Sequence, residues 1–168
     1  MLELYKQIVV SQFEAALAMF NQCVAACPSE HWEGKIANGP FRWVAYHTLF
    51  FADLYLSPSE SAFQLRDLHE RGGDERGEDA SPGLSKEETL AYVPLVRQKL
   101  LETLAAETAE SLAGPSGFSW RKFSRAEIHL YNLRHVQHHT GQMGAYLRRV
   151  APALFGQRSL PWIGAGWR

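Results

Sequence analysis

The stretch SRAEIHLYNLRHVQHHTGQMGAYLRRV, residues 124–150, predicts one long helix and holds four of the seven histidines of the chain. Ser124 and Glu127 match a capping box, in which each side chain accepts a hydrogen bond from the backbone N–H of the other residue. Apolar residues recur at helical spacing as far as Val150, and Pro152 lies just beyond. We therefore predict a helix over about residues 124–150.

Helical geometry separates the histidines of this stretch. At about 100° per residue, His135 and His139 project within about 40° of each other. They fall in the apolar stripe that also contains Met143 and Tyr146. Two imidazoles four residues apart lie about 6 Å apart along the helix axis and can reach one ion. His138 projects toward the wetter side, so we expect it at the rim of such a site.

A third histidine lies in a second predicted helix. His47 is at the centre of an apolar face that includes Trp43, Phe51 and Leu54. A buried imidazole needs hydrogen-bond or metal partners for its nitrogens, and these neighbours offer none. The inward pair of the last helix can supply that partner. We therefore predict one divalent metal ion bound by three side chains: His47, His135 and His139.

The rest of the chain predicts three further helices, over about residues 3–27, 40–57 and 85–110. A short helical piece is expected over 59–68, an exposed polar loop over 71–83, and a chain break at GPSG, 114–117. Ser85 and Glu88 form a second capping box, and Pro94 is expected to kink the third long helix. The aromatic tail after residue 153 is expected to pack across the bundle. The fold class is all-α, a four-helix bundle in one domain, 1–168.

Composition narrows the classes of function. The 168 residues are 46% hydrophobic and carry a net charge of −1, which gives no reason to expect nucleic acid or an anionic membrane as partner. No apolar run reaches the roughly 18 residues of a membrane span, and the first residues do not resemble a signal peptide. We place the protein in the cytoplasm. Cys23 and Cys27 are expected to be small buried hydrophobes, with a metal or redox role as the alternative.

The segments WVAYHTLFFADLY, residues 43–55, and LRHVQHHTGQM, residues 133–143, resemble the DinB/YfiT-like superfamily of metal-binding four-helix bundles. That family has one histidine on the second helix and two, four apart, on the last, followed closely by Gly-Gln. Thr140 departs from the family pattern, in which arginine is common at this position. The resemblance implies an up-down-down-up bundle, a divalent metal ion on the three histidines and a homodimer.

The function remains open between classes. Three neutral imidazoles leave a coordination position free, which is typical of catalytic metal sites. We therefore expect a metal-dependent enzyme acting on a small molecule, either a low-molecular-weight-thiol S-transferase or a hydrolase. The alternatives are a non-catalytic metal-binding stress-response protein and an interaction module. A zinc protease is disfavoured, because Val136 stands where a glutamate base would follow the first histidine. Zinc and nickel are the leading candidates for the metal ion because imidazole suits both, and iron, cobalt and manganese are the other candidates.

No catalytic base or nucleophile can be assigned from the sequence. Asp53 projects about 120° away from His47. The side chains expected beside the ligands are Gln142, Asn132, Tyr131 and Tyr146. If the protein is an enzyme, we expect an open pocket lined by Trp43, Phe51 and Trp162. The other histidines, His31, His69 and His129, are expected at the surface or at the boundary of the core.

Overall fold

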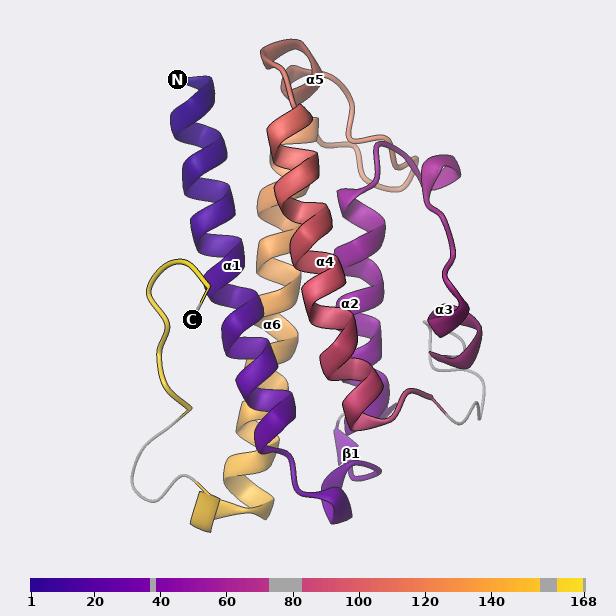
Figure 1. The fold of residues 1–168 in the computed structure, drawn as a ribbon, viewed down its shortest axis with the longest axis vertical. Helices are drawn as coiled ribbons and strands as arrows, with labels where there is room; N and C mark the ends of the chain where they lie inside the picture. The colour runs from indigo at the N-terminus through magenta and orange to yellow at the C-terminus, as the bar shows by residue number, and fades with distance from the viewer. Residues whose placement is uncertain (37–38, 73–82, 155–159, 168) are drawn as a thin grey trace.

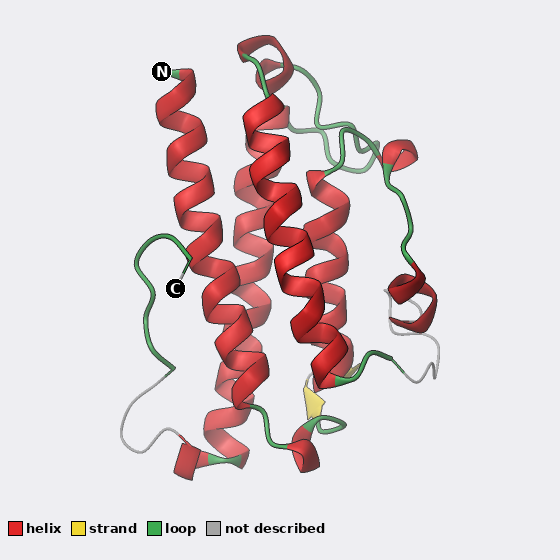
Figure 2. Cartoon of the chain, viewed as in Figure 1, coloured by secondary structure: helices red, strands yellow, loops and turns green. Residues whose placement is uncertain are grey.

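The computed structural model describes residues 1–36, 39–72, 83–154 and 160–167. Within these residues the chain is mostly helical, as the sequence predicted (Figure 2). The strands β1 (Lys35–Ile36) and β2 (Gly39–Pro40) form one small antiparallel pair. The long helices of the described chain lie side by side (Figure 1). They are α1 (Leu2–Ala26), α2 (Phe41–Leu56), α4 (Lys86–Ala106) and α6 (Arg125–Val150).

The core lies where these four helices meet. Helix α1 packs against α4 and α6, and α2 packs against the same two helices. Large side chains from each helix are fully buried between them: Phe13, Leu17 and Phe20 of α1, Tyr46 and Leu49 of α2, Tyr92 and Leu100 of α4, and Ile128 and Leu147 of α6. Their removal from water is the main favourable term that holds the helices together.

Both predicted capping boxes are confirmed. Ser85 and Glu88 exchange side-chain-to-backbone hydrogen bonds at the start of α4, and Ser124 and Glu127 do so at the start of α6. These bonds satisfy backbone N–H groups that a helix start leaves without partners. Pro94 lies inside α4.

The predicted end of the third long helix at about residue 110 is wrong. Helix α4 ends at Ala106, and Glu107 adopts an extended conformation with ψ 140°. Thr108 then caps a separate short helix, α5 (Ala109–Ala113), by accepting a hydrogen bond from the backbone N–H of Ser111. This local capping competes with continuation of the helix, because side-chain oxygens of Ser and Thr favour helix starts.

The predicted helical piece over 59–68 is only partly right. A single turn of 3₁₀ helix, η2 (Glu60–Ala62), follows Ser59, and the chain then has no regular secondary structure until α3 (Asp67–Gly72) begins. The predicted loop over 71–83 lies largely outside the described residues. Another 3₁₀ turn, η1 (Ser29–His31), follows α1, and η3 (Pro152–Leu154) follows α6.

The tail packs along α1, in agreement with the expectation that it crosses the bundle. Ile163 is buried against Ala15 and Ala18, and the backbone N–H of Gly166 donates to the carbonyl oxygen of Ser11 over 2.8 Å. The ring of Trp167 lies 5.5 Å from the guanidinium carbon of Arg97. These contacts place the tail on the α1 side of the molecule.

Helix α1 is long and apolar enough to span a membrane by length and composition alone, so the expectation that no stretch reaches that limit is wrong. The helix has a more direct explanation in the fold. It buries nine residues of its length, among them Val9, Phe13 and Leu17, against its neighbours. Its apolar composition is thus the composition of a core helix.

Candidate metal centre

The structure brings the three predicted histidines together. His47 projects from α2, and His135 and His139 project from α6, which packs directly against α2. One ring nitrogen from each histidine lies within 4.8 Å of the others. The Nε2 atoms of His47 and His135 are 3.3 Å apart. The ring centroids of His47 and His139 are 4.9 Å apart, and those of His135 and His139 are 4.6 Å apart. These residues form the three-histidine cluster.

The spacing of this cluster fits a small divalent ion. Zinc binds imidazole nitrogen at about 2.0–2.1 Å, so two nitrogens in a tetrahedral site are about 3.3–3.4 Å apart. The separation between His47 and His135 is close to that value. Nδ1 of His139 donates to Oε1 of Gln142 over 2.8 Å. This hydrogen bond leaves Nε2 of His139 without a proton, which is the form that binds a metal.

The electrostatics also favour neutral ligands. Burial, together with smaller contributions from the neighbouring imidazoles, lowers the pKa of His135 to about 2. Burial likewise lowers the pKa of His139 to about 4, although its hydrogen bond with Gln142 acts in the opposite direction. Metal binding requires the unprotonated imidazole, so no proton has to leave these two side chains near neutral pH.

A cavity of about 320 Å³ opens beside the cluster. The cavity is lined by His47, Phe51, Tyr55, Arg121, Tyr131, His135, His138 and His139. These side chains are aromatic or cationic, and no carboxylate of the described chain lines the cavity. His138 is exposed at its edge, with its ring 4.9 Å from that of His139, so its expected place at the rim is confirmed. The cluster is therefore accessible from one side.

The expected pocket walls are only partly right. Phe51 lines the cavity, while the ring of Trp43 lies 4.9 Å from the ring of His47 and supports it from another side. Trp162 does not line the cavity and is 80% exposed, so that prediction is wrong. The reason is tertiary: the tail packs along α1, whereas the cluster lies between α2 and α6.

The expected neighbours of the ligands divide in the same way. Gln142 contacts His139, and Tyr131 lines the cavity. Asn132 instead donates to the carbonyl oxygen of Ala52 over 2.9 Å and ties α6 to α2. The prediction that Tyr146 lies beside the ligands is wrong, because its ring packs against His31 and Phe41 near the C-terminal end of α6. His31 is half-buried there, as expected for a boundary residue.

The prediction that His69 lies at the surface or at the boundary of the core is wrong, because the residue is only 5% exposed. Its Nδ1 accepts from the backbone N–H of Arg66, and its Nε2 contacts the Tyr92 hydroxyl at 2.7 Å. Tyr92 donates a hydrogen bond to Asp53, which also accepts hydrogen bonds from the ammonium group of Lys99. Asp53 points away from His47, as predicted, and is completely buried in this network. Burial lowers the pKa of His69 to about 4.

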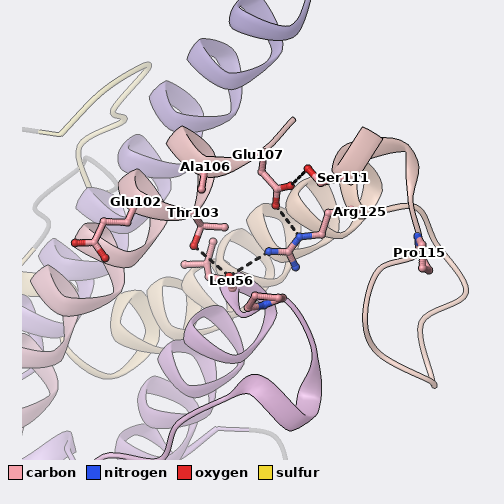
Figure 3. A pocket seen from close by; sticks show the side chains of 9 residues that line it. Leu56, Glu102, Thr103, Ala106, Glu107, Ser111, Pro115 and Arg125 are labelled. Carbon is pink, nitrogen blue, oxygen red and sulfur yellow. Dashed lines mark hydrogen bonds and ion pairs between the residues drawn. The ribbon is translucent and has the colours of Figure 1, made fainter. Parts of the chain in front are cut away.

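His129 was expected at the boundary of the core, and the structure corrects this as well: it is fully buried. Its Nε2 donates to Oε1 of Glu107 over 3.1 Å, and the same oxygen accepts from Nε of Arg125 over 2.7 Å. Figure 3 shows the Glu107–Arg125 pair and Ser111, which donates to the other carboxylate oxygen. Burial alone would raise the pKa of Glu107, but the hydrogen bonds from His129, Ser111 and Arg125 prevail and lower it to about 2.

The cavity beside this pair, about 520 Å³, is a weaker candidate for a functional site. Arg125 donates to the carbonyl oxygens of Tyr55, Leu56 and Ser57 as well as to Glu107, so it joins the end of α2 to α6. Figure 3 shows Arg125 between Leu56 and Glu107. The carboxylate of Glu107 and the guanidinium of Arg125 are thus already paired with each other. The arrangement has the character of a structural cross-link between helix ends.

Cys23 and Cys27 are both buried and free, as expected. Burial raises the pKa of Cys23 to about 12 and that of Cys27 to about 11. Both thiols therefore stay protonated near neutral pH and behave as small apolar side chains.

Two residues that line the cavity, Tyr55 of α2 and Arg121, were not singled out from the sequence, and Arg121 is the charged one. It lies in the loop between α5 and α6, where helical periodicity carries no information about side-chain direction. In the sequence, Arg121 is distinguished only by being close to the start of the helix that carries His135 and His139, and this closeness does not place it at the cavity.

Comparison with known families agrees with the geometry of the three-histidine cluster. Residues 12–143 match the DinB superfamily, and this range contains His47, His135 and His139. No curated protein and no solved structure matches the chain. Since the family match covers most of the sequence, the chain belongs to the DinB superfamily.

Proposed function

We propose that the protein binds one divalent metal ion through His47, His135 and His139 and uses it in chemistry on a small molecule. The main support for this proposal is that three imidazole nitrogens lie within 4.8 Å of one another beside an open cavity. A divalent ion held by three neutral nitrogens keeps an open coordination position, where it acidifies a bound water or thiol. Zinc and nickel are the leading ions, since both suit imidazole.

The chain's own residues prepare this site. Gln142 accepts from Nδ1 of His139 and so directs the other nitrogen to the cluster. The rings of Trp43 and Phe51 flank His47, with centroids 4.9 and 4.7 Å from its own. These contacts restrict the imidazole to few orientations. Rigid ligands reduce the conformational entropy that is lost when an ion binds.

The reaction we favour is transfer of a low-molecular-weight thiol, with hydrolysis as the second candidate. No carboxylate, cysteine or serine lines the cavity among the described residues. Because these common protein nucleophiles do not line the cavity, we propose that the nucleophile comes from outside. A thiol co-substrate meets this requirement through its own sulfur, and water does so in hydrolysis. The substrate is a small molecule.

A non-catalytic role has one supporting observation. The cluster joins α2 to α6, and His47 and His135 are 88 residues apart in sequence. An ion at this place would cross-link the two helices and stabilise the folded chain. The alternative is therefore a metal-binding stress-response protein without enzymatic activity. Both roles require the same metal ligands, so only a measurement of catalytic turnover distinguishes the non-catalytic protein from the enzyme.

We further propose a single-domain up-down-down-up four-helix bundle that forms a homodimer in the cytoplasm. The packing of α1 and α2 on both α4 and α6 supports this bundle. The near-zero net charge favours partners other than nucleic acid or an anionic membrane surface.

Metal binding is tested with protein prepared without a polyhistidine tag. Elemental analysis and thermal unfolding with zinc, nickel, cobalt, manganese or iron should identify an ion that raises Tm. His47→Gln should abolish this rise, whereas His138→Gln, a matched change at the rim, should retain it. A metal-induced rise of equal size in both variants would exclude the three-histidine cluster as the site.

The reaction is tested on the metal-loaded protein with bacillithiol, mycothiol and glutathione as thiols and an aryl halide as electrophile. In this reaction a sulfur–carbon bond forms, the carbon–halogen bond breaks, and the thiol proton leaves to the buffer. We expect conjugate formation with one thiol and none in His47→Gln. Stabilisation by metal with no conjugation and no hydrolysis would favour the non-catalytic role.

A further inference from the structure

We propose that Arg121 binds the carboxylate of the small-molecule substrate and places the rest of that substrate between the three-histidine cluster and an adjoining aromatic cavity. This inference rests on the proposed function, because it assigns a substrate class to the same site. It starts from a cationic side chain that faces the cavity without an acidic partner.

Arg121 lies where two cavities meet. It lines the cavity of the three-histidine cluster together with Phe51 and Tyr55. The same three residues line a second cavity of about 390 Å³. The remaining walls of that second cavity are mostly apolar: Phe50, Leu54, Glu60, Phe63 and Trp120. A ligand held at Arg121 can therefore extend toward the histidines on one side and along aromatic rings on the other.

The guanidinium is held in place by Tyr131. Nη2 of Arg121 donates to the Tyr131 hydroxyl over 2.6 Å, and the guanidinium carbon lies 4.6 Å from the centroid of that ring. The hydroxyl and ring are neutral, so they orient the cation without neutralising it. Nε of Arg121 is buried and has no hydrogen-bond partner. One N–H of the guanidinium therefore has no acceptor among the described residues, and the side chain that carries it lines the cavity.

The other partly buried arginines of the described chain behave differently. Arg125 pairs with Glu107, Arg97 with Glu14 and Arg42 with Glu33. Arg121 makes no ion pair within the described residues, and the one carboxylate near it, Glu60, lines only the second cavity. An arginine without a carboxylate partner is suited to take one from a ligand, because its planar fork matches a carboxylate in a bidentate way.

The loop that carries Arg121 is also built to be rigid. The backbone N–H of Arg121 donates to the carbonyl oxygen of Phe118, and its carbonyl oxygen accepts from the hydroxyl of Ser116, which is buried. Gly117 has φ +88°, and a Cβ there would meet the carbonyl oxygen of Pro58. Only glycine tolerates both the conformation and the close approach. The loop thus fixes Arg121 relative to the end of α2.

The predicted ligand is a small carboxylate with an aromatic or other apolar group. The lining of the three-histidine cavity contributes one permanent positive charge, Arg121, and no negative charge in the described residues. An anion is favoured there, and a bound metal ion would increase that preference. The apolar group is expected to contact Phe51 and Tyr55.

The test uses 3-phenylpropanoate and its neutral amide, which differ in charge but hardly in shape. Binding is measured by calorimetry to zinc-loaded protein. Arg121→Gln should weaken binding of the acid about tenfold to a hundredfold, the range expected for loss of a charged hydrogen bond. Binding of the amide should change less than twofold. Arg148→Gln, which removes the same charge from an exposed position on α6, should affect neither probe.

Two outcomes would overturn the inference: wild-type protein that does not prefer the acid over the amide, or an Arg121→Gln variant that retains the preference. Failure of the metal proposal is detected separately. His47→Gln should lose metal binding yet keep an Arg121-dependent preference for the acid. Arg121→Gln should keep the metal-induced rise in Tm, which also shows that the variant folds.

Discussion

Two histidines on the same helix, six residues apart, occupy opposite chemical environments. His129 is fully buried against Glu107 and Arg125, and His135 is half-buried against two other imidazoles. Burial is the largest cause of a lowered pKa for both. Burial therefore does not separate a structural histidine from a candidate ligand. The neighbours do, because a carboxylate satisfies an imidazole within the fold, whereas a group of neutral imidazoles leaves lone pairs that a cation can use.

The two regions also differ in what a lost side chain leaves behind. Removal of Arg125 leaves the buried carboxylate of Glu107 without its ion-pair partner, with hydrogen bonds only from His129 and Ser111. Removal of His135 leaves only neutral groups, and its Nδ1 has no hydrogen-bond partner to lose. The charged network should therefore govern the stability of the metal-free protein, and the three-histidine cluster should govern its response to metal.

The largest effect is expected for Arg125→Met in the metal-free protein. It should lower the free energy of unfolding by about 3–5 kcal/mol, the usual cost of breaking a buried ion pair from one side. His135→Leu, an apolar change in the other region, should cost less than about 1.5 kcal/mol, the usual limit for changes of similar volume. Urea denaturation followed by circular dichroism measures both. Equal losses in the two variants would break the distinction between the regions.

An intermediate effect is expected on pH dependence. The pKa of His69 is lowered to about 4, below its ordinary value of 6.5. The unfolded chain therefore binds a proton there before the folded chain does, so stability falls as the pH drops from about 6.5 to 4. Glu107, with a pKa of about 2, keeps its contribution above pH 4.5 and loses it only as the pH falls toward 2.

The measurement is the free energy of unfolding of the metal-free protein between pH 7 and pH 4. His69→Gln should remove its share of the loss, of order 1–3 kcal/mol, and leave a shallower slope. His31→Gln, a change at a half-buried histidine outside the charged networks, is the matched control. A slope in His69→Gln as steep as in the wild type would show that this histidine does not contribute.

The smallest effect is expected for Gln142→Leu, which removes the acceptor for Nδ1 of His139. Metal affinity should fall about tenfold, the lower end of the range for residues that orient metal ligands. A competitive chelator titration measures it. Gln137→Leu on the same helix, whose amide contacts Met19, should leave the affinity unchanged. Unchanged affinity in Gln142→Leu would mean that His139 needs no support from this side chain.

Local patterns accounted for much of the fold. The long helices begin within a residue or two of the predicted positions, because capping boxes and helical periodicity act over three or four residues and are visible in sequence. The end of α4 was missed, since the cap formed by Thr108 and Ser111 competes with a helical pattern that continues past it. The piece after Pro58 was missed because contacts with Gly117 and His69 decide its shape.

For the site, the sequence by itself determined the three histidines of the cluster, since His47 is at the centre of an apolar helix face and His135 and His139 lie in the apolar stripe of another, where an imidazole needs a partner. It also determined Gln142 as a neighbour of His139, because both lie on one helix. Which groups these helix faces contact was decided only by the tertiary structure. It placed His69 and His129 against carboxylates, Trp162 away from the cavity and Arg121 at its edge. The physical reason is that helical periodicity gives the direction of a side chain from its own axis, whereas the group it meets depends on packing between distant segments and on loops without periodicity.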